Sequence, residues 1–169
     1  MLVDSHCHLD YPDFDAERDA IVQRARDAGV GRMVSIGVKL SLFERVYALT
    51  QQYADVFAAV GVHPHEAGAE GLDEPDILIE HTKRDKVVAI GESGLDYFYE
   101  RSPRDRQTVS FRTHIKAAQE TQLPLVVHSR DADQDTLALL REGHAVKPFP
   151  CVIHCFTGGL ELMQGCVEM

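Results

Sequence analysis

Six short apolar runs alternate with amphipathic helical segments along almost the whole chain. Strands are expected at 2–8, 32–38, 57–63, 87–92, 124–129 and 151–156. The runs are nearly all apolar and do not alternate with polar residues, which is typical of parallel strands covered on both faces. A repeated strand and helix unit of this kind predicts an α/β fold with one parallel sheet.

Side chains that bind metals fall near the ends of four of these runs. They are His6, His8, Glu92, His128 and His154. In a β/α barrel the catalytic groups come from the carboxyl ends of different strands, so these side chains are expected to converge. Burying a carboxylate such as Glu92 after so apolar a run is costly unless a cation meets it. The pattern therefore predicts a site for divalent metal.

The first run adds a local constraint. Side chains alternate along a strand, so His6 and His8 are expected on one face and Cys7 on the other. Two neutral imidazoles one strand repeat apart can bind the same cation. Cys7, Cys151 and Cys155 are expected to point away from the histidines toward the covering helices, as buried and reduced thiols.

The number of units decides between two architectures. A closed barrel needs eight β/α units and about 250 residues, whereas this chain has 169. An open doubly wound sheet would suffice for six strands, but no glycine-rich turn follows the first strand. We therefore expect a TIM-type (β/α) barrel with six of its eight units present, as a single incomplete domain over 1–169. Such a chain is expected to associate with itself through its open barrel edges.

Composition narrows the classes of protein. The chain is 44% hydrophobic and 26% charged, which is typical of a soluble globular protein. No apolar stretch approaches the ~20 residues of a membrane span, and without a signal region at the amino terminus a cytoplasmic location is expected. The formal charge of −10 argues against a broad basic face for nucleic acid. Bound divalent ions would still supply local positive charge for a phosphoryl substrate.

Five ordered motifs resemble those of the TatD family of metal-dependent deoxyribonucleases, within the amidohydrolase-like superfamily. They are Val3–Asp10, Val60–His65, Ile90–Tyr97, Leu125–Arg130 and Ile153–Phe156. The similarity runs from one end of the chain to the other. It implies a hydrolase in which a metal-activated water cleaves DNA phosphodiester bonds.

The resemblance also implies two divalent ions. His6 and His8 would hold one ion, His128 and His154 the second, and Glu92 would bridge them as the catalytic residue. The family pattern includes an aspartate after a later strand, as ligand and general base, and this sequence ends before that point. Imidazole ligands favour Zn, Mn, Fe or Ni, whereas the resemblance favours Mg, so the identity of the ions stays open.

Three further residues are expected to contact substrate. His63 and His65 end the third run, and Arg130 follows His128 with a fork of donors suited to phosphate. For the two histidines the alternative is a turn fixed by Pro64 with exposed rings. For Arg130 it is a salt bridge to one of the nearby aspartates.

Other functions on the same scaffold remain open. One is an amidohydrolase acting on cyclic amides, another an aminoacyl-tRNA ester hydrolase, and a third an inactive truncated remnant that only binds metal. Many binuclear amidohydrolases bridge their metals with a modified lysine, where this chain has Glu92, and this favours phosphoester chemistry. Asp96 is expected either to accept a hydrogen bond from an imidazole or to cap a turn.

Overall fold

The fold is built on one curved, six-stranded parallel sheet. A computed structural model describes all of residues 1–169. Each strand pairs with its sequence neighbours, in the order β1 to β6. The strands are β1 (Leu2–Cys7), β2 (Val30–Ile36), β3 (Val56–Val60), β4 (Val87–Asp96), β5 (Leu125–Arg130) and β6 (Cys151–Ile153). This sequential order confirms the partial barrel, because a doubly wound sheet reverses its order at a switch point.

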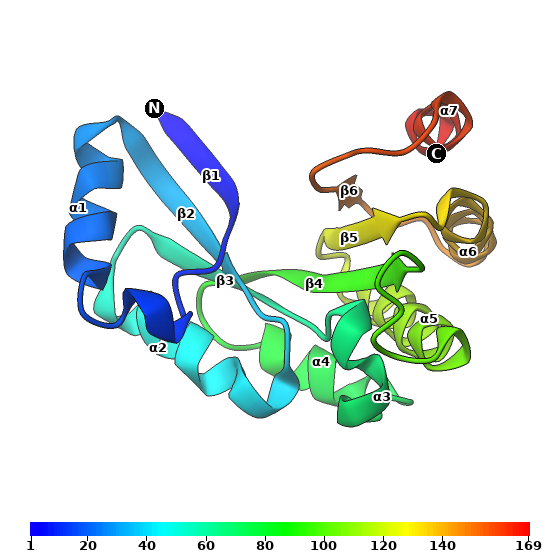
Figure 1. The fold of residues 1–169 in the computed structure, drawn as a ribbon, viewed down its shortest axis with the longest axis horizontal. Helices are drawn as coiled ribbons and strands as arrows, with labels where there is room; N and C mark the ends of the chain where they lie inside the picture. The colour runs from blue at the N-terminus through cyan, green and yellow to red at the C-terminus, as the bar shows by residue number, and fades with distance from the viewer.

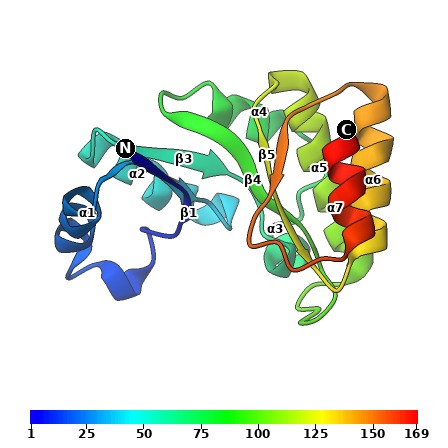
Figure 2. The same cartoon turned by 90° about the horizontal axis from the view of Figure 1, so that it is seen from above.

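The helices cover the outer side of this sheet. Between the strands lie α1 (Arg18–Asp27), α2 (Phe43–Gln52), α3 (Ala67–Glu70), α4 (Asp76–Thr82), α5 (Arg104–Thr121) and α6 (Asp133–Val146), and α7 (Leu160–Glu168) follows β6. Figure 1 shows them around the convex side, with β1 and β6 on either side of the open face. Seen from above, the strands lie inside the curve of helices (Figure 2). None of these helices has the length and apolarity that crossing a membrane requires.

The core lies mainly between the sheet and its helices. Its largest cluster joins Phe43 of α2, Ile90 of β4 and Phe111 of α5, all fully or almost fully buried.

Strand β3 contributes to two clusters. Ala58 and Val60 belong to the largest one, whereas Ala59 between them packs in a separate small cluster with Ile36, Ala89 and Val126. Because side chains alternate along a strand, that small cluster lies on the concave face. It forms the floor beneath the carboxyl ends of the strands.

Two local expectations are wrong. The fourth strand runs to Asp96, beyond the expected end at Glu92. Gly91 and Gly94 have φ values of 119° and 138°, and they let an irregular strand continue past a register shift.

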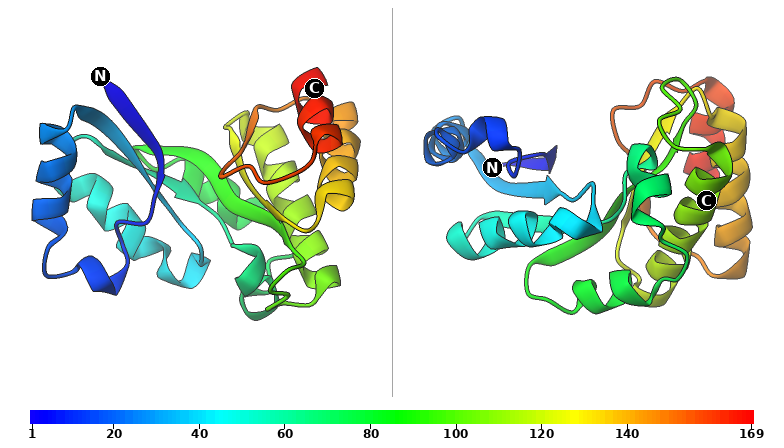
Figure 3. Two further views of the ribbon diagram at one scale, coloured as in Figure 1. Left: turned by 45° about the horizontal axis from the view of Figure 1, so that its top comes forward. Right: turned by 60° about the horizontal axis from the view of Figure 1, so that its bottom comes forward.

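The second concerns the cysteines, which were expected to be buried. All four cysteines are free, but Cys151 and Cys155 are exposed. The edge position of β6 explains this exposure, because no further strand covers it (Figure 3).

Candidate metal centre

Glu92 lies at the centre of a ring of imidazoles. Its side chain is 3% exposed. His6 Nε2 and His8 Nε2 lie 3.3 and 3.9 Å from its Oε2 atom. On the other side, its Oε1 atom lies 3.7 Å from His63 Nε2, 3.1 Å from His128 Nδ1 and 2.5 Å from His154 Nε2. Strands β1, β4 and β5, with the ends of β3 and β6, thus bring one carboxylate and five imidazoles together.

The first strand positions its two histidines as alternation requires. His6 and His8 both approach Glu92 Oε2, while Cys7 points to the other side, where its thiol donates to Val34 O. His8 Nδ1 donates to Ile36 O at 3.3 Å. This bond leaves the lone pair of neutral His8 on Nε2, facing Glu92, which is the tautomer that a metal ligand needs.

The donor atoms fit a divalent cation. Those of His6, His8 and Glu92 lie within 4.8 Å of one another, as do those of His63, Glu92 and His128. Both ring nitrogens of His6 are buried without a hydrogen-bond partner. A buried imidazole without partners is costly, and a cation shared with His8 and Glu92 would satisfy it. The residues present therefore fit a metal ion on the β1 side.

A hydrogen bond from the backbone distinguishes His63 from the other histidines around Glu92. His63 Nδ1 accepts a hydrogen bond from the backbone N–H of His65 at 3.1 Å. The proton of neutral His63 must then be on Nε2, so this nitrogen can donate toward Glu92 or a substrate oxygen but has no lone pair for a metal. His154 Nε2 is closer to Glu92, and the ring of His154 stacks on that of His6 with centroids 3.9 Å apart.

The electrostatics favour an ionised Glu92 beside neutral His63 and His8, whereas the pKa of His128 is raised, because its bonds to Glu92 and Asp96 outweigh its burial. Burial opposes ionisation of Glu92, but hydrogen bonds from His128 and His154 and the close approach of His6 hold its pKa well below the usual range. Burial lowers the pKa of His63 to about 3 and also lowers that of His8, despite the nearby Glu92. Neutral imidazoles keep one nitrogen lone pair, as ligand chemistry requires.

A second carboxylate fixes the outer ends of two imidazoles. Asp96 Oδ2 lies 2.8 Å from His65 Nε2 and 3.1 Å from His128 Nε2, and Asp96 Oδ1 accepts from the Tyr99 N–H. Burial raises the pKa of Asp96, but the bonds from Tyr99, His65 and His128 outweigh it and lower the pKa. Asp96 is thus both an imidazole acceptor and a turn cap. His65 faces Asp96 and not Glu92.

Two hollows open onto the ring of imidazoles. One, of about 370 Å³, is lined by His8, His63, His65, Glu92 and Arg101 among others. The second, of about 530 Å³, is lined by Phe98, Arg130 and Thr157, and shares His128 and His154 with the first. Arg130 makes no salt bridge to the aspartates that follow it; its guanidinium lies over the rings of Phe98 and Tyr99. It therefore stays available at the rim.

Comparison with known proteins shows the family to which the chain belongs. The model of the family described as TatD related DNase matches residues 3–169. The chain belongs to the TatD-related DNase family. It is 36% identical to an uncharacterized metal-dependent hydrolase, YabD, of Bacillus subtilis, over 100% of this chain and 66% of that protein. It is 35% identical to a protein named 3'-5' ssDNA/RNA exonuclease TatD of Citrobacter koseri, over 99% of this chain and 64% of that protein.

Solved structures show the same TatD architecture. The TatD homologue YjjV of Escherichia coli superimposes with a TM-score of 0.85 at 32% identity, over 99% of this chain and 64% of that chain. The phosphotriesterase homology protein of Escherichia coli, at 17% identity and a TM-score of 0.54, shares the fold. The chain thus spans about two thirds of the length of the TatD relatives that it matches.

Proposed function

We propose that this chain carries the metal-binding part of a hydrolase that cleaves DNA phosphodiester bonds. The observation that supports it most is the setting of Glu92, an ionised carboxylate among imidazoles of which His8 has its lone pair turned inward. Family membership supports the same chemistry, since relatives are named metal-dependent hydrolases and nucleases.

In this proposal two ions would share Glu92. His6 and His8 would hold one of them, and His128 and His154 would hold the other. When bound, divalent ions lower the pKa of water and neutralise charge that develops on the phosphate oxygens. Magnesium, zinc, manganese and nickel are the candidates, as imidazole ligands and the nuclease resemblance point to different metals.

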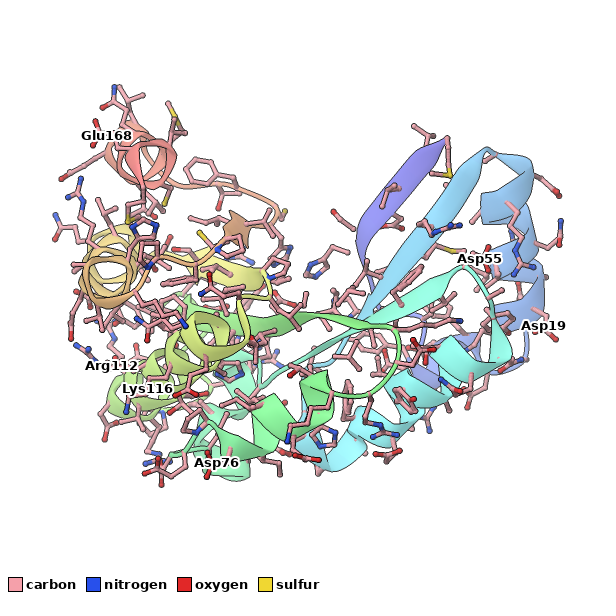
Figure 4. All side chains as sticks on the ribbon, turned by 180° about the vertical axis from the view of Figure 1, so that it is seen from behind. Asp19, Asp55, Asp76, Arg112, Lys116 and Glu168 are labelled. Atoms are coloured by element: carbon pink, nitrogen blue, oxygen red, sulfur yellow. The ribbon has the colours of Figure 1, made fainter.

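The remaining polar residues of the site have roles set by their bonds. His63 donates from Nε2, so it orients Glu92 or binds a phosphate oxygen. Asp96 holds His128, and with it His65, in a fixed ring orientation. Arg130 at the rim pairs with a phosphate. Asp19, Asp76 and Glu168 lie at the outer margin of the molecule (Figure 4), whereas Glu66 and Asp131 each line one of the two hollows.

The decisive variant is Glu92→Gln. After chelation and reloading with Mg²⁺, Mn²⁺, Zn²⁺ or Ni²⁺, we expect bound metal, measured by elemental analysis, to fall together with cleavage of a single-stranded oligodeoxynucleotide. The expected loss of activity is about 100-fold or more, since even indirect partners of metal ligands are worth 10- to 100-fold. Glu70→Gln is the matched control, because the Glu70 carboxylate lies outside the ring of imidazoles and accepts a hydrogen bond from Ser41 Oγ at 2.6 Å.

Competing substrates complete the test. A cyclic amide and an aminoacyl ester are assayed with the same metal-loaded samples. Hydrolysis of either one with the oligonucleotide left intact would refute phosphodiester cleavage. Unchanged metal content in Glu92→Gln would refute the proposed ligand set.

A further inference from the structure

Two exposed aromatic rings stand at the rim of the metal centre. Phe98 and Tyr99 lie in the loop after β4, beyond Tyr97, and are 56% and 49% exposed. Their rings meet edge to face, with centroids 4.8 Å apart. Exposing two adjacent aromatic rings forfeits the burial that such side chains normally gain, so their position beside a hollow calls for a ligand.

Contacts with residues of the metal centre hold the loop of the two rings in place. The Tyr99 N–H donates to Asp96 at 2.9 Å, and the ring of Tyr99 meets that of His65 with centroids 5.6 Å apart. Asp96 in turn bonds His128. The loop that carries the rings is therefore fixed by the same carboxylate that orients the imidazoles.

Unpaired guanidinium groups accompany the rings. Arg130 Cζ lies 4.6 Å from the centroid of Phe98 and 4.9 Å from that of Tyr99, and Arg101 Cζ lies 5.5 Å from that of Tyr99. Neither arginine makes an ion pair, whereas arginines away from the site, such as Arg26 and Arg112, do. Their donors face the site without a carboxylate partner.

We propose that Phe98, Tyr99 and Arg130 form a stacking subsite for an unpaired nucleobase of single-stranded DNA next to the cleaved phosphate. The proposal rests on the phosphodiesterase function above and adds the group that recognises the strand. The 530 Å³ hollow beside Phe98 and Arg130 reaches His128 and His154, so a base there places its phosphate near the imidazoles. Arg101 and Arg130 supply donors for the flanking phosphates.

The subsite accounts for selection of single strands. A base within a duplex is stacked on both faces and cannot rest on a protein ring without being flipped out, which costs energy. An unpaired base has a free face, and stacking on an aromatic side chain favours it without regard to sequence. Every base has such a face, so preference for one base over another should be small.

The test compares an oligothymidylate with an abasic oligonucleotide of equal length. In the doubly substituted Phe98→Leu/Tyr99→Leu chain, we expect binding of the oligothymidylate, measured by fluorescence anisotropy with metal present, to weaken about 5- to 100-fold. Binding of the abasic strand should stay the same. Phe14→Leu is the matched control, an exposed aromatic residue that lines neither hollow, and circular dichroism verifies that each variant folds.

The outcomes separate the two proposals. If the double substitution weakens binding of both strands equally, or weakens binding of neither, the stacking subsite is overturned. Cleavage of the oligothymidylate by the parent chain would in that case still support the phosphodiesterase function. Suppose instead that the double substitution weakens binding of the oligothymidylate but not of the abasic strand, and that the parent chain cleaves no oligonucleotide. This result would support the subsite and count against the proposed function.

Discussion

At the scale of single residues, His114 shows how a histidine outside the metal centre couples stability to pH. It is fully buried in α5; its Nδ1 donates to Ser110 O and its Nε2 accepts from the Val62 N–H. Burial lowers its pKa to about 4 from the usual 6.5. Both ring nitrogens are thus satisfied only in the neutral form.

The expected result is acid destabilisation in a defined window. His114 binds a proton below about pH 6.5 in the unfolded chain but only below about pH 4 in the folded chain. The free energy of unfolding should therefore fall by on the order of 2 kcal/mol from pH 7 to pH 5 through His114. Urea unfolding at several pH values measures it. His114→Gln should flatten the dependence, and an equal slope in both chains would contradict this account.

Residue-level prediction succeeds where side chains keep the alternation of an extended chain. His6 and His8 share a face as alternation demands. His63 and His65 have the same spacing, but Pro64 begins a 3₁₀ turn, Pro64–Glu66, so His63 turns to Glu92 and His65 to Asp96. The tautomer of His63 depends on a backbone N–H that no spacing pattern reveals.

At the scale of elements, the junction of β4 and α5 depends on Gln107. This fully buried side chain accepts from the Asp96 N–H and donates to Asp96 O and Ser102 O. Gln107→Leu would leave these groups buried without partners. We expect the free energy of unfolding to drop by about 2–4 kcal/mol, as measured by urea titration.

A matched substitution on the same helix provides the comparison. Gln119 donates one bond, to Gly143 O at 2.7 Å, from a partly buried position. Gln119→Leu should therefore cost less than Gln107→Leu. A loss in Gln107→Leu no larger than that in Gln119→Leu would show that Gln107 does not hold the junction together.

The existence of each strand was predictable because the apolar runs are long and bounded by polar segments. The length of β4 was not predictable, because a glycine such as Gly94 is typical of a strand end or a bulge when only sequence is considered. Gly91 and Gly94 have positive φ values where β5 approaches closely; a Cβ on Gly94 would lie 2.0 Å from His128 O. That constraint exists only in the folded sheet.

At the scale of the whole molecule, the two edge strands are exposed. Leu2 and Val3 of β1 are 62% and 57% exposed, and Val152 of β6 is 47% exposed. Strand edges with apolar side chains pair with other chains. We expect the 169-residue chain to associate with itself as its concentration rises, with the weight-average mass followed by light scattering.

A charge on the edge should oppose this association. Val3→Lys is expected to shift the association to higher concentration, because a lysine on an edge strand disfavours pairing. Leu160→Lys, at an exposed apolar residue of α7, is the control. A mass of one chain at all concentrations, or equal effects of both substitutions, would exclude association through the edge of β1.

The positions of the proposed ligands have a consequence for synthesis on the ribosome. His6 and His154 stack on one another although they are separated by most of the chain. A nascent chain, growing at ~5–20 residues per second, holds its first imidazoles for many seconds before the last one emerges. A site that needs both His6 and His154 can therefore form only after most of the chain is made, and the apolar core would hold the strands in order before then.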